Sequence, residues 1–259
     1  MLIPRKECKV ALRFYQAFFR INPLLTPLKP RCIIKEKGDV TMKIKWYGHS
    51  AFKITTSSDI RIIIDPYESG AFGGSVAYGK ITDEADIVLT SHDHGDHNYI
   101  KDIKGKFVHI EKAGQYEEKG VKIEAISTFH DKSKGQERGA NLVFVISTEN
   151  IVVAHLGDLG HTLDGNALQS IGRVDVLLLP VGGFYTIDAK EATKVMNDIN
   201  PAITMPMHYR TEKIAMPIDG LEGFIKDKNT VKEVNTSEIV ITKATLPKTN
   251  EIIVMQHAL

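Results

Sequence analysis

The sequence is poor in the features that mark several classes of protein. It holds only two cysteines, Cys8 and Cys32, and no Cys-x-x-Cys spacing, which excludes a cysteine-based zinc site. No apolar run reaches the ~18 residues that a transmembrane helix needs. The formal net charge is only +1, so the overall charge does not point to nucleic acid or to an anionic membrane. We therefore expect no nucleic-acid partner and no transmembrane segment.

Size and composition favour a single globular domain. The chain has 259 residues, of which 42% are hydrophobic and 25% charged. Residues 1–41 differ from the rest, and Arg13 and Arg20 interrupt any apolar centre of a secretory signal. Residues 10–19 could form a short basic amphipathic helix, but an appended segment that packs on the surface or stays mobile is the favoured interpretation. We predict an N-terminal extension over 1–41, one domain over 42–259 and a cytoplasmic location.

Short strand-like runs dominate the domain, with few helices. Strands are predicted, from polar–apolar alternation or continuous apolar runs, at 43–47, 51–54, 61–64, 87–89, 107–110, 121–126, 142–146, 151–154, 176–179 and 202–205. Helices are predicted at 189–199, 165–171 and 220–226, the first with Asp188 as N-cap and Glu191 three residues later. This pattern indicates an α/β fold in which two sheets pack face to face with helices outside.

Histidine and aspartate residues follow four of the predicted strands. Residues 87–91 lead into His92, residues 123–129 into His130, residues 151–154 into His155 and Asp158, and residues 202–207 into His208. Functional sites in layered α/β folds collect at the carboxyl ends of strands. If these strands run in similar directions, all four clusters meet at one edge of the fold.

The first cluster, His92-Asp93-His94-Gly95-Asp96-His97, has the spacing of a metal-binding loop. His92 and His94 are two residues apart, so both can reach one ion in an extended or turning segment. Gly95 permits a tight bend, after which Asp96 and His97 can face a neighbouring ion. Imidazole nitrogens and carboxylate oxygens suit Zn²⁺, Mn²⁺ and Fe²⁺. The alternative is a solvated histidine-rich loop.

The remaining clusters complete two sets of ligands. Asp158 is a carboxylate that can bridge two ions, although Gly157-Asp158 is also good turn chemistry. His130 and His208 would each close one set, although a histidine after a strand is often only a hydrogen-bonded residue. Each ion would then keep a position for water, as catalytic sites require.

These motifs together resemble the metallo-β-lactamase-fold hydrolase superfamily. The resemblance rests on the order and spacing of residues 90–97, 129–131, 157–160 and 206–209, and residues 46–50, 64–66, 138–141 and 182–186 make it similar to the UlaG-like (ascorbate-6-phosphate lactonase-like) branch. It implies a four-layer αββα sandwich with two divalent metal ions, zinc or manganese with iron as a further option, at one edge. The resemblance assigns His92, His94 and His130 to one ion, Asp96, His97 and His208 to the other, and Asp158 to both. It also makes Asp65 a buried acid that supports the ligand loop. The usual Gly-Asp-Thr turn reads Gly157-Asp158-Leu159 here, which loses a hydroxyl but keeps the ligand.

Other residues near the expected site are candidates for auxiliary roles. Asp96 is expected both to bind a metal and to orient the attacking hydroxide. His49 and His161 could protonate a leaving group or bind substrate, or could instead cap a turn or support a metal ligand. His155 is expected to support a ligand. Tyr185, Tyr209 and Arg210 are predicted to contact substrate, the alternative being a solvated rim.

The sequence therefore favours an enzyme that hydrolyses an ester or lactone bond of a small, anionic substrate. Two alternatives stay open, namely a phosphodiesterase or nuclease, and a metal or ligand sensor without turnover. A nuclease of this superfamily usually carries a large inserted domain, and no segment here is long enough to hold one. The expected partner is a small molecule, and a homo-oligomer is compatible with the sequence.

Overall fold

The structure is a computed structural model that describes residues 40–259. Almost all of the predicted 1–41 extension, including Cys8, Cys32 and the amphipathic segment 10–19, lies outside the described residues. In the part of the chain that is described, no helix is long and apolar enough to cross a membrane.

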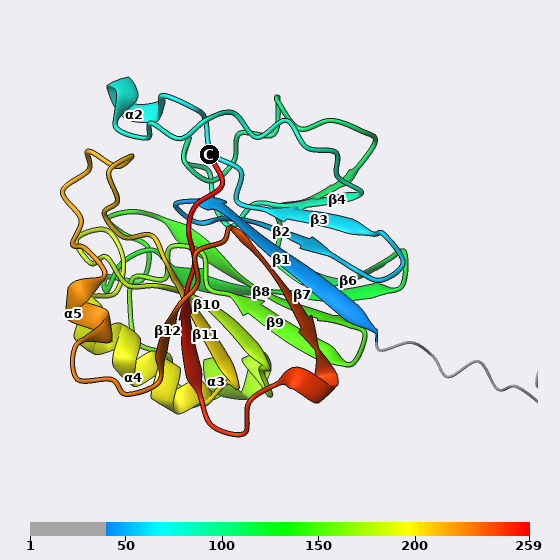
Figure 1. Cartoon of the computed structure of the whole chain (residues 1–259). Helices are drawn as coiled ribbons and strands as arrows, with labels where there is room; N and C mark the ends of the chain where they lie inside the picture. The colour runs from blue at the N-terminus through cyan, green and yellow to red at the C-terminus, as the bar shows by residue number, and fades with distance from the viewer. Residues whose placement is uncertain (1–39) are drawn as a thin grey trace, which may run out of the picture. The chain divides into compact units, whose positions relative to one another are not determined.

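Two β-sheets pack against each other (Figure 1). The six-stranded sheet contains, in spatial order, β13 (Glu238–Thr242), β1 (Thr41–Gly48), β2 (Ala51–Thr55), β3 (Arg61–Ile64), β4 (Ile87–Leu89) and β5 (Val108–Ile110). The eight-stranded sheet contains β12 (Val231–Glu233), β14 (Glu251–Val254), β11 (Ile203–Met207), β10 (Val176–Pro180), β9 (Ile151–His155), β8 (Ala140–Thr148), β7 (Val121–Phe129) and β6 (Gly114–Glu118). Both sheets mix parallel and antiparallel pairs.

The main core fills the space between the two sheets. Every second side chain along a strand points to the same face of its sheet, so one set of side chains faces the opposite sheet. In β1, Met42, Ile44 and Trp46 are buried in this core, as are Val121 and Ile123 of β7 on the opposite sheet. The central strand β10 is buried along its whole length. The predicted alternation in residues 43–47 is thus confirmed.

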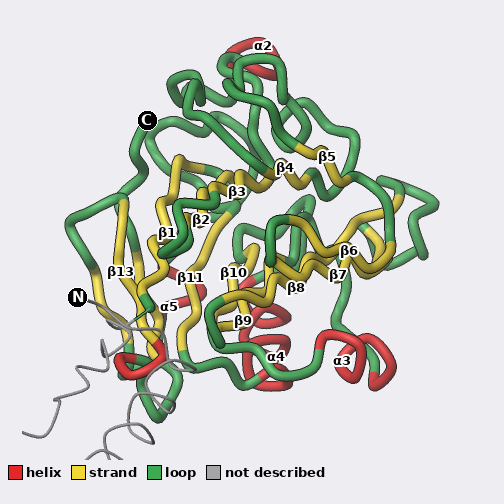
Figure 2. The backbone as a smooth tube through the Cα atoms, turned by 90° about the vertical axis from the view of Figure 1, so that its right-hand side faces the viewer, coloured by secondary structure: helices red, strands yellow, loops and turns green. Residues whose placement is uncertain are grey.

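Helices cover the outer face of the eight-stranded sheet (Figure 2). They are α3 (Gly165–Ile171), α4 (Ala189–Ile199) and α5 (Glu222–Ile225), of which α3 and α4 match the prediction and α5 is shorter than the predicted 220–226. Asp188 caps α4 as predicted, because its carboxylate accepts hydrogen bonds from the backbone N–H groups of Lys190 and Glu191. Ala192 and Met196 of α4 are buried.

Loops rather than long helices cover the outer face of the six-stranded sheet. Its only helical piece among residues 40–259 is the four-residue α2 (Ala71–Gly74). A second hydrophobic cluster lies beneath these loops and includes Tyr47, Tyr67, Tyr78 and Ile218. The predicted αββα sandwich is therefore correct in its layers, with one outer layer made mainly of loops.

Candidate metal centre

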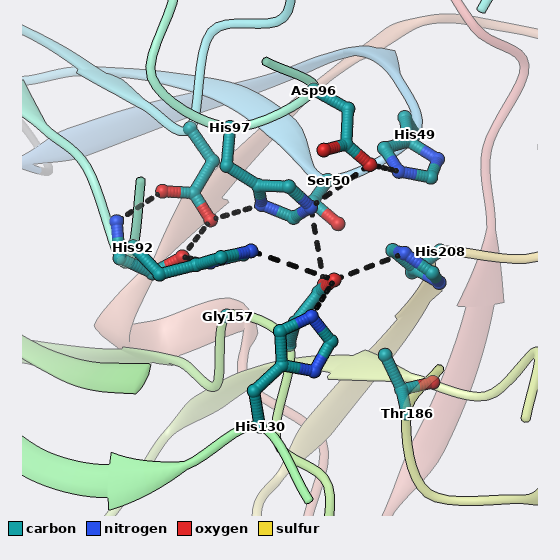
Figure 3. Close-up of polar contacts among 12 residues, drawn as sticks. His49, Ser50, His92, Asp96, His97, His130, Gly157, Thr186 and His208 are labelled. Carbon is teal, nitrogen blue, oxygen red and sulfur yellow. Dashed lines mark hydrogen bonds and ion pairs between the residues drawn. The ribbon is translucent and has the colours of Figure 1, made fainter. Parts of the chain in front are cut away.

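Four loops meet at one edge of the sandwich, as the sequence predicts (Figure 3). His92 lies three residues after β4, His130 directly follows β7, and Asp158 and His208 follow β9 and β11. Strands β9 and β11 both run parallel to β10, and β7 runs in the same direction because β8 is antiparallel to both β7 and β9. The clusters meet although β4 belongs to the other sheet, because the two sheets end at a common edge.

The side chains gather into two sets, and a third group of His92, His97 and Asp158 connects them. One nitrogen each of His92, His94 and His130 lies within 4.8 Å of the others, and the same holds for ligand atoms in the set His49, Asp96, His97 and His208. Apart from His49, these are the two sets predicted from the sequence.

Asp158 lies between the two sets, as expected for a bridge. Its Oδ2 is 3.3 Å from Nε2 of His130 and 3.2 Å from Nε2 of His208. Its Oδ1 is 3.2 Å from Nε2 of His97. Two ligands at about 2.1 Å from one tetrahedral ion are about 3.4 Å apart, so these separations suit a shared cation.

Buried polar atoms without partners support the same reading. Within residues 40–259, Nε2 of His92, His97 and His208 and Oδ1 of Asp158 are buried and have no hydrogen-bond partner. A buried polar group left unsatisfied costs about 1–3 kcal/mol. Divalent cations would satisfy all four atoms, so the residues present fit a metal centre.

Burial keeps several of these histidines neutral, which is the form that binds metal. Burial, followed by the charge of His97, lowers the pKa of His92 to about 3, and burial likewise lowers the pKa of His94. His97 differs. Burial lowers its pKa, but the carboxylates of Asp158 and Asp96 outweigh burial and raise it well above the ordinary value. Without metal, a proton on His97 therefore offsets part of the negative charge.

Asp65 fixes the loop that carries His92 to His97 through hydrogen bonds. It is fully buried, and its carboxylate accepts hydrogen bonds from the backbone N–H of Ser91 at 2.7 Å, the Ser91 hydroxyl at 2.7 Å and Nδ1 of His97 at 2.8 Å. Because Nδ1 of His97 donates to Asp65, Nε2 is the nitrogen that faces the site, and it could bind an ion after giving up its proton. This is the supporting position that the resemblance implies.

His155 also lies behind the ligands. Its Nδ1 accepts a hydrogen bond from the backbone N–H of Gly157 at 3.1 Å, and its Nε2 donates to the carbonyl of Ser50 at 2.9 Å. It is fully buried, and burial lowers its pKa. The neutral ring thus connects the turn that carries Asp158 to the loop after β1.

Asn141 is a positioning residue that sequence reasoning missed as such. Its Oδ1 accepts a hydrogen bond from the backbone N–H of Asp158 at 2.9 Å, and its Nδ2 donates to Leu156 O at 2.9 Å. The turn needs glycine here, because a Cβ on Gly157 would lie 2.3 Å from Oδ1 of Asn141. The only sequence signal was its place in the stretch 138–141.

His49 faces Asp96. It is fully buried, and its Nε2 lies 3.0 Å from Oδ2 of Asp96. Burial, followed by the charge of His208, lowers its pKa to about 4. His49 is not among the described residues that line the open cavity above the ligands. The structure therefore places His49 against Asp96 and outside the lining of this cavity.

The other residues predicted to contact substrate or to transfer a proton lie in different surroundings. Tyr185 lines the cavity. His161 is occupied by the backbone, since its Nδ1 donates to Thr162 O at 2.9 Å and its Nε2 accepts from Phe129 N at 3.3 Å. Tyr209 is buried and packs on Trp46 with ring centroids 5.6 Å apart.

The described residues that line the cavity do not include Arg210, His161 or Tyr209. Arg138, which was not predicted as a substrate contact, lies there instead.

The cavity is an opening of about 400 Å³ above the ligand sets. Its floor is formed by His94, Asp96, His130, Asp158 and His208. A two-sheet sandwich with histidine and aspartate ligands beneath an open cavity at one edge defines a metallo-β-lactamase-fold protein.

Comparison with known proteins agrees with this class. The model of the beta-lactamase superfamily domain matches residues 43–208. A UPF0173 metal-dependent hydrolase from Thermococcus onnurineus is 30% identical over 225 residues, which cover 77% of this chain and 99% of that protein. The chain therefore belongs to the metallo-beta-lactamase superfamily, in the UPF0173 metal-dependent hydrolase family.

Solved structures support the same assignment. A protein from Thermotoga maritima, described as a Zn-dependent hydrolase of this superfamily, is 36% identical with a TM-score of 0.69, covering 83% of this chain and 98% of that one. A protein from Parabacteroides distasonis, described as a metal-dependent hydrolase, is 18% identical with a TM-score of 0.55, covering 84% of this chain and 94% of that one. The second likeness concerns the fold alone.

Proposed function

We propose that this metal-dependent hydrolase is binuclear and cleaves an ester or lactone bond of a small, anionic substrate. The observation that carries the proposal is the position of Asp158 between two ligand sets, with its carboxylate near histidines of both. In the proposed assignment, His92, His94 and His130 hold one ion, Asp96, His97 and His208 hold the other, and Asp158 contributes to both. Zinc, manganese and iron all suit these ligands.

Two bound divalent ions would supply Lewis acidity and would lower the pKa of water to roughly 7. Their charge would exceed that of Asp96 and Asp158 together, so the site would favour an anionic substrate or a developing oxyanion. The similarity of several motifs to the UlaG-like branch supports a lactone or related ester as the bond attacked.

Asp96 takes a double role in this mechanism. Its Oδ2 is held by Nε2 of His49, while the residue also lines the cavity floor. Burial raises its pKa, but His97 and His49 outweigh burial and lower the pKa well below the ordinary value, so the carboxylate is ionised. In this role the ionised Asp96 carboxylate would bind one ion and accept a hydrogen bond from the attacking water, which orients it.

The test is a steady-state assay of metal-free protein after separate addition of Zn²⁺ and Mn²⁺. The substrates are lactones, acyl esters and phosphodiesters. We expect metal-dependent hydrolysis of esters or lactones, and loss of this activity in His94→Ala. The matched control is His109→Gln, on the edge strand β5 and outside both ligand sets. Turnover of phosphodiesters alone, or metal binding without any turnover, would contradict the proposal and favour a phosphodiesterase or a sensor.

A further inference from the structure

One wall of the site cavity is apolar and belongs to a single structural unit. It consists of Phe72 and Ser75 from the loop around α2, and of Ala215, Met216 and Pro217 from the loop after β11. The two loops are joined, because the backbone N–H of Ala215 donates to Ser75 O at 2.9 Å. Of the described residues in this apolar wall, only Ser75 carries a polar side-chain group.

Phe72 is unusual within the apolar wall. Its side chain is 55% exposed, and its backbone has φ 53°, a left-handed conformation that bulky residues rarely adopt. Strained backbone of this kind often marks a functional position. Because Phe72 lines the cavity, its exposed phenyl ring offers an apolar contact surface to a ligand there.

A polar wall makes up another part of the lining and comes from loops of the eight-stranded sheet. It consists of Glu137 and Arg138, in the loop between β7 and β8, and of Tyr185 after β10. The Arg138 guanidinium lies 5.8 Å from the centre of the Tyr185 ring and 3.7 Å from the Glu137 carboxylate. Its side chain is 32% exposed, so it is accessible from the cavity.

The loop that carries Arg138 is built to a fixed shape. The carboxylate of Asp131 accepts four backbone hydrogen bonds from this loop, from Ser133, Gly135, Glu137 and Arg138, at 2.7–3.0 Å. The guanidinium is thus presented by an ordered backbone, which lowers the entropy lost on binding an anion. Arginine suits this task because its planar fork binds carboxylate or phosphate in two places.

The polar wall also leaves room for a ligand group. Glu137, Arg138 and Tyr185 line a second cavity of about 270 Å³ in addition to the site cavity. An anionic group bound to Arg138 would therefore lie at the boundary of two open spaces.

We propose that the substrate is amphiphilic, with an apolar acyl group on the Phe72–Met216 wall, an anionic group at Arg138, and the ester bond between them. The inference rests on the proposed function, because it places the scissile bond over the ligand sets. It names Arg138 as the residue that selects the anion and Met216 and Phe72 as those that select the acyl group. The anion is a carboxylate or a phosphate.

The test compares O-hexanoylglycolate with its neutral counterpart O-hexanoylglycolamide, and each with the O-acetyl ester. In the metal-loaded wild type we expect kcat/KM to favour the anionic ester. Arg138→Gln should lower kcat/KM for the glycolate by roughly tenfold to a hundredfold and leave the glycolamide nearly unchanged. The matched control Arg210→Gln, which changes an arginine outside the cavity, should leave both unchanged.

The apolar wall is tested by acyl length. Each methylene that binds on this wall should raise kcat/KM by up to about fourfold. Met216→Ser should reduce the ratio of hexanoyl to acetyl ester, whereas Val240→Ser, at an exposed position on β13, should not. Circular dichroism and thermal unfolding of each variant check that the fold is retained.

Binding gives a readout without turnover. Calorimetry should show that N-hexanoylglycine, an uncleaved amide analogue, binds the wild type more tightly than N-hexanoylglycinamide, and that Arg138→Gln removes the difference. If the esters are cleaved but neither Arg138 nor Met216 affects selectivity, the inference is overturned and the proposed function stands. If the analogue binds with the expected dependence on Arg138 but no ester is cleaved, the proposed function fails while the amphiphilic site is supported.

Discussion

At the residue scale, the site depends on side chains that hold the ligands as well as on the ligands. Asp65 is the clearest case, since it fixes both the backbone at Ser91 and the ring of His97. We expect Asp65→Asn to weaken metal binding by roughly 10–100-fold, because the single amide oxygen cannot accept from all three donors that the carboxylate serves. Competition with a fluorescent chelator would measure this. Asp59→Asn is the control, because Asp59 shares the left-handed backbone of Asp65 but is exposed. Equal affinities in the two variants would contradict this role.

A His49 variant can show whether this residue positions Asp96 or binds a metal ion itself. Its φ is 51°, which asparagine tolerates, so His49→Asn should keep the backbone and lose the hydrogen bond to Asp96. If His49 only orients Asp96, kcat should fall by roughly 10–100-fold while the metal content stays the same. Loss of one ion per chain would instead show that His49 is a ligand.

Residue patterns located the His/Asp cluster better than they located the residues that line the cavity above it. Dense His/Asp spacing next to strand ends is sufficient to indicate a metal loop, because the chain itself brings neighbours together. Arg210 was predicted to contact substrate, whereas Arg138, which lines the cavity, was not. The direction in which a loop side chain points depends on backbone hydrogen bonds such as that from Arg138 to Asp131, which only the folded loop shows.

At the element scale, buried apolar strands were the most predictable. Strands β3 and β4 have the predicted bounds, and α3 and α4 are also as predicted. Four strands were missed, namely β6, β12, β13 and β14. The first reads Gly-Gln-Tyr-Glu-Glu and forms an edge, so tertiary pairing with β7 rather than local pattern makes it a strand.

The central strand β10 should dominate stability. Leu178 is fully buried in the core, so Leu178→Ala should lower the free energy of unfolding by about 2–5 kcal/mol. Val240 on the edge strand β13 is 57% exposed, so Val240→Ala should change it by less than about 0.5 kcal/mol. Urea unfolding of the metal-free protein measures both. Similar losses in the two variants would contradict the assignment of the core.

At the scale of the whole molecule, acid stability should depend on Asp83. Burial raises its pKa, but hydrogen bonds from Lys53 and Tyr47 outweigh burial and lower the pKa to about 2. Because the unfolded value is higher, near 3.8, Asp83 stabilises the fold above about pH 4 and this contribution is lost as the pH falls toward 2.

Asp83→Asn should therefore reduce the loss of stability between about pH 4 and pH 2, relative to wild type. Urea midpoints of the metal-free protein at several pH values measure this. Parallel pH profiles for the two proteins would show that Asp83 does not titrate as described.

The sandwich and the shared edge were predictable because strand direction and polar strand ends suffice to place them. The loop layer over the six-stranded sheet was not, since it depends on long-range packing such as that of Tyr67 and Tyr78 on Ile218.

The central claim is that two divalent ions bind across Asp158. Metal analysis of purified protein loaded with Zn²⁺ tests it most directly, with wild type beside His94→Ala and the control His109→Gln. We expect about two ions per chain in the wild type and in the control, and a marked loss in His94→Ala. Equal metal content in all three proteins, or a single ion in the wild type, would contradict the account.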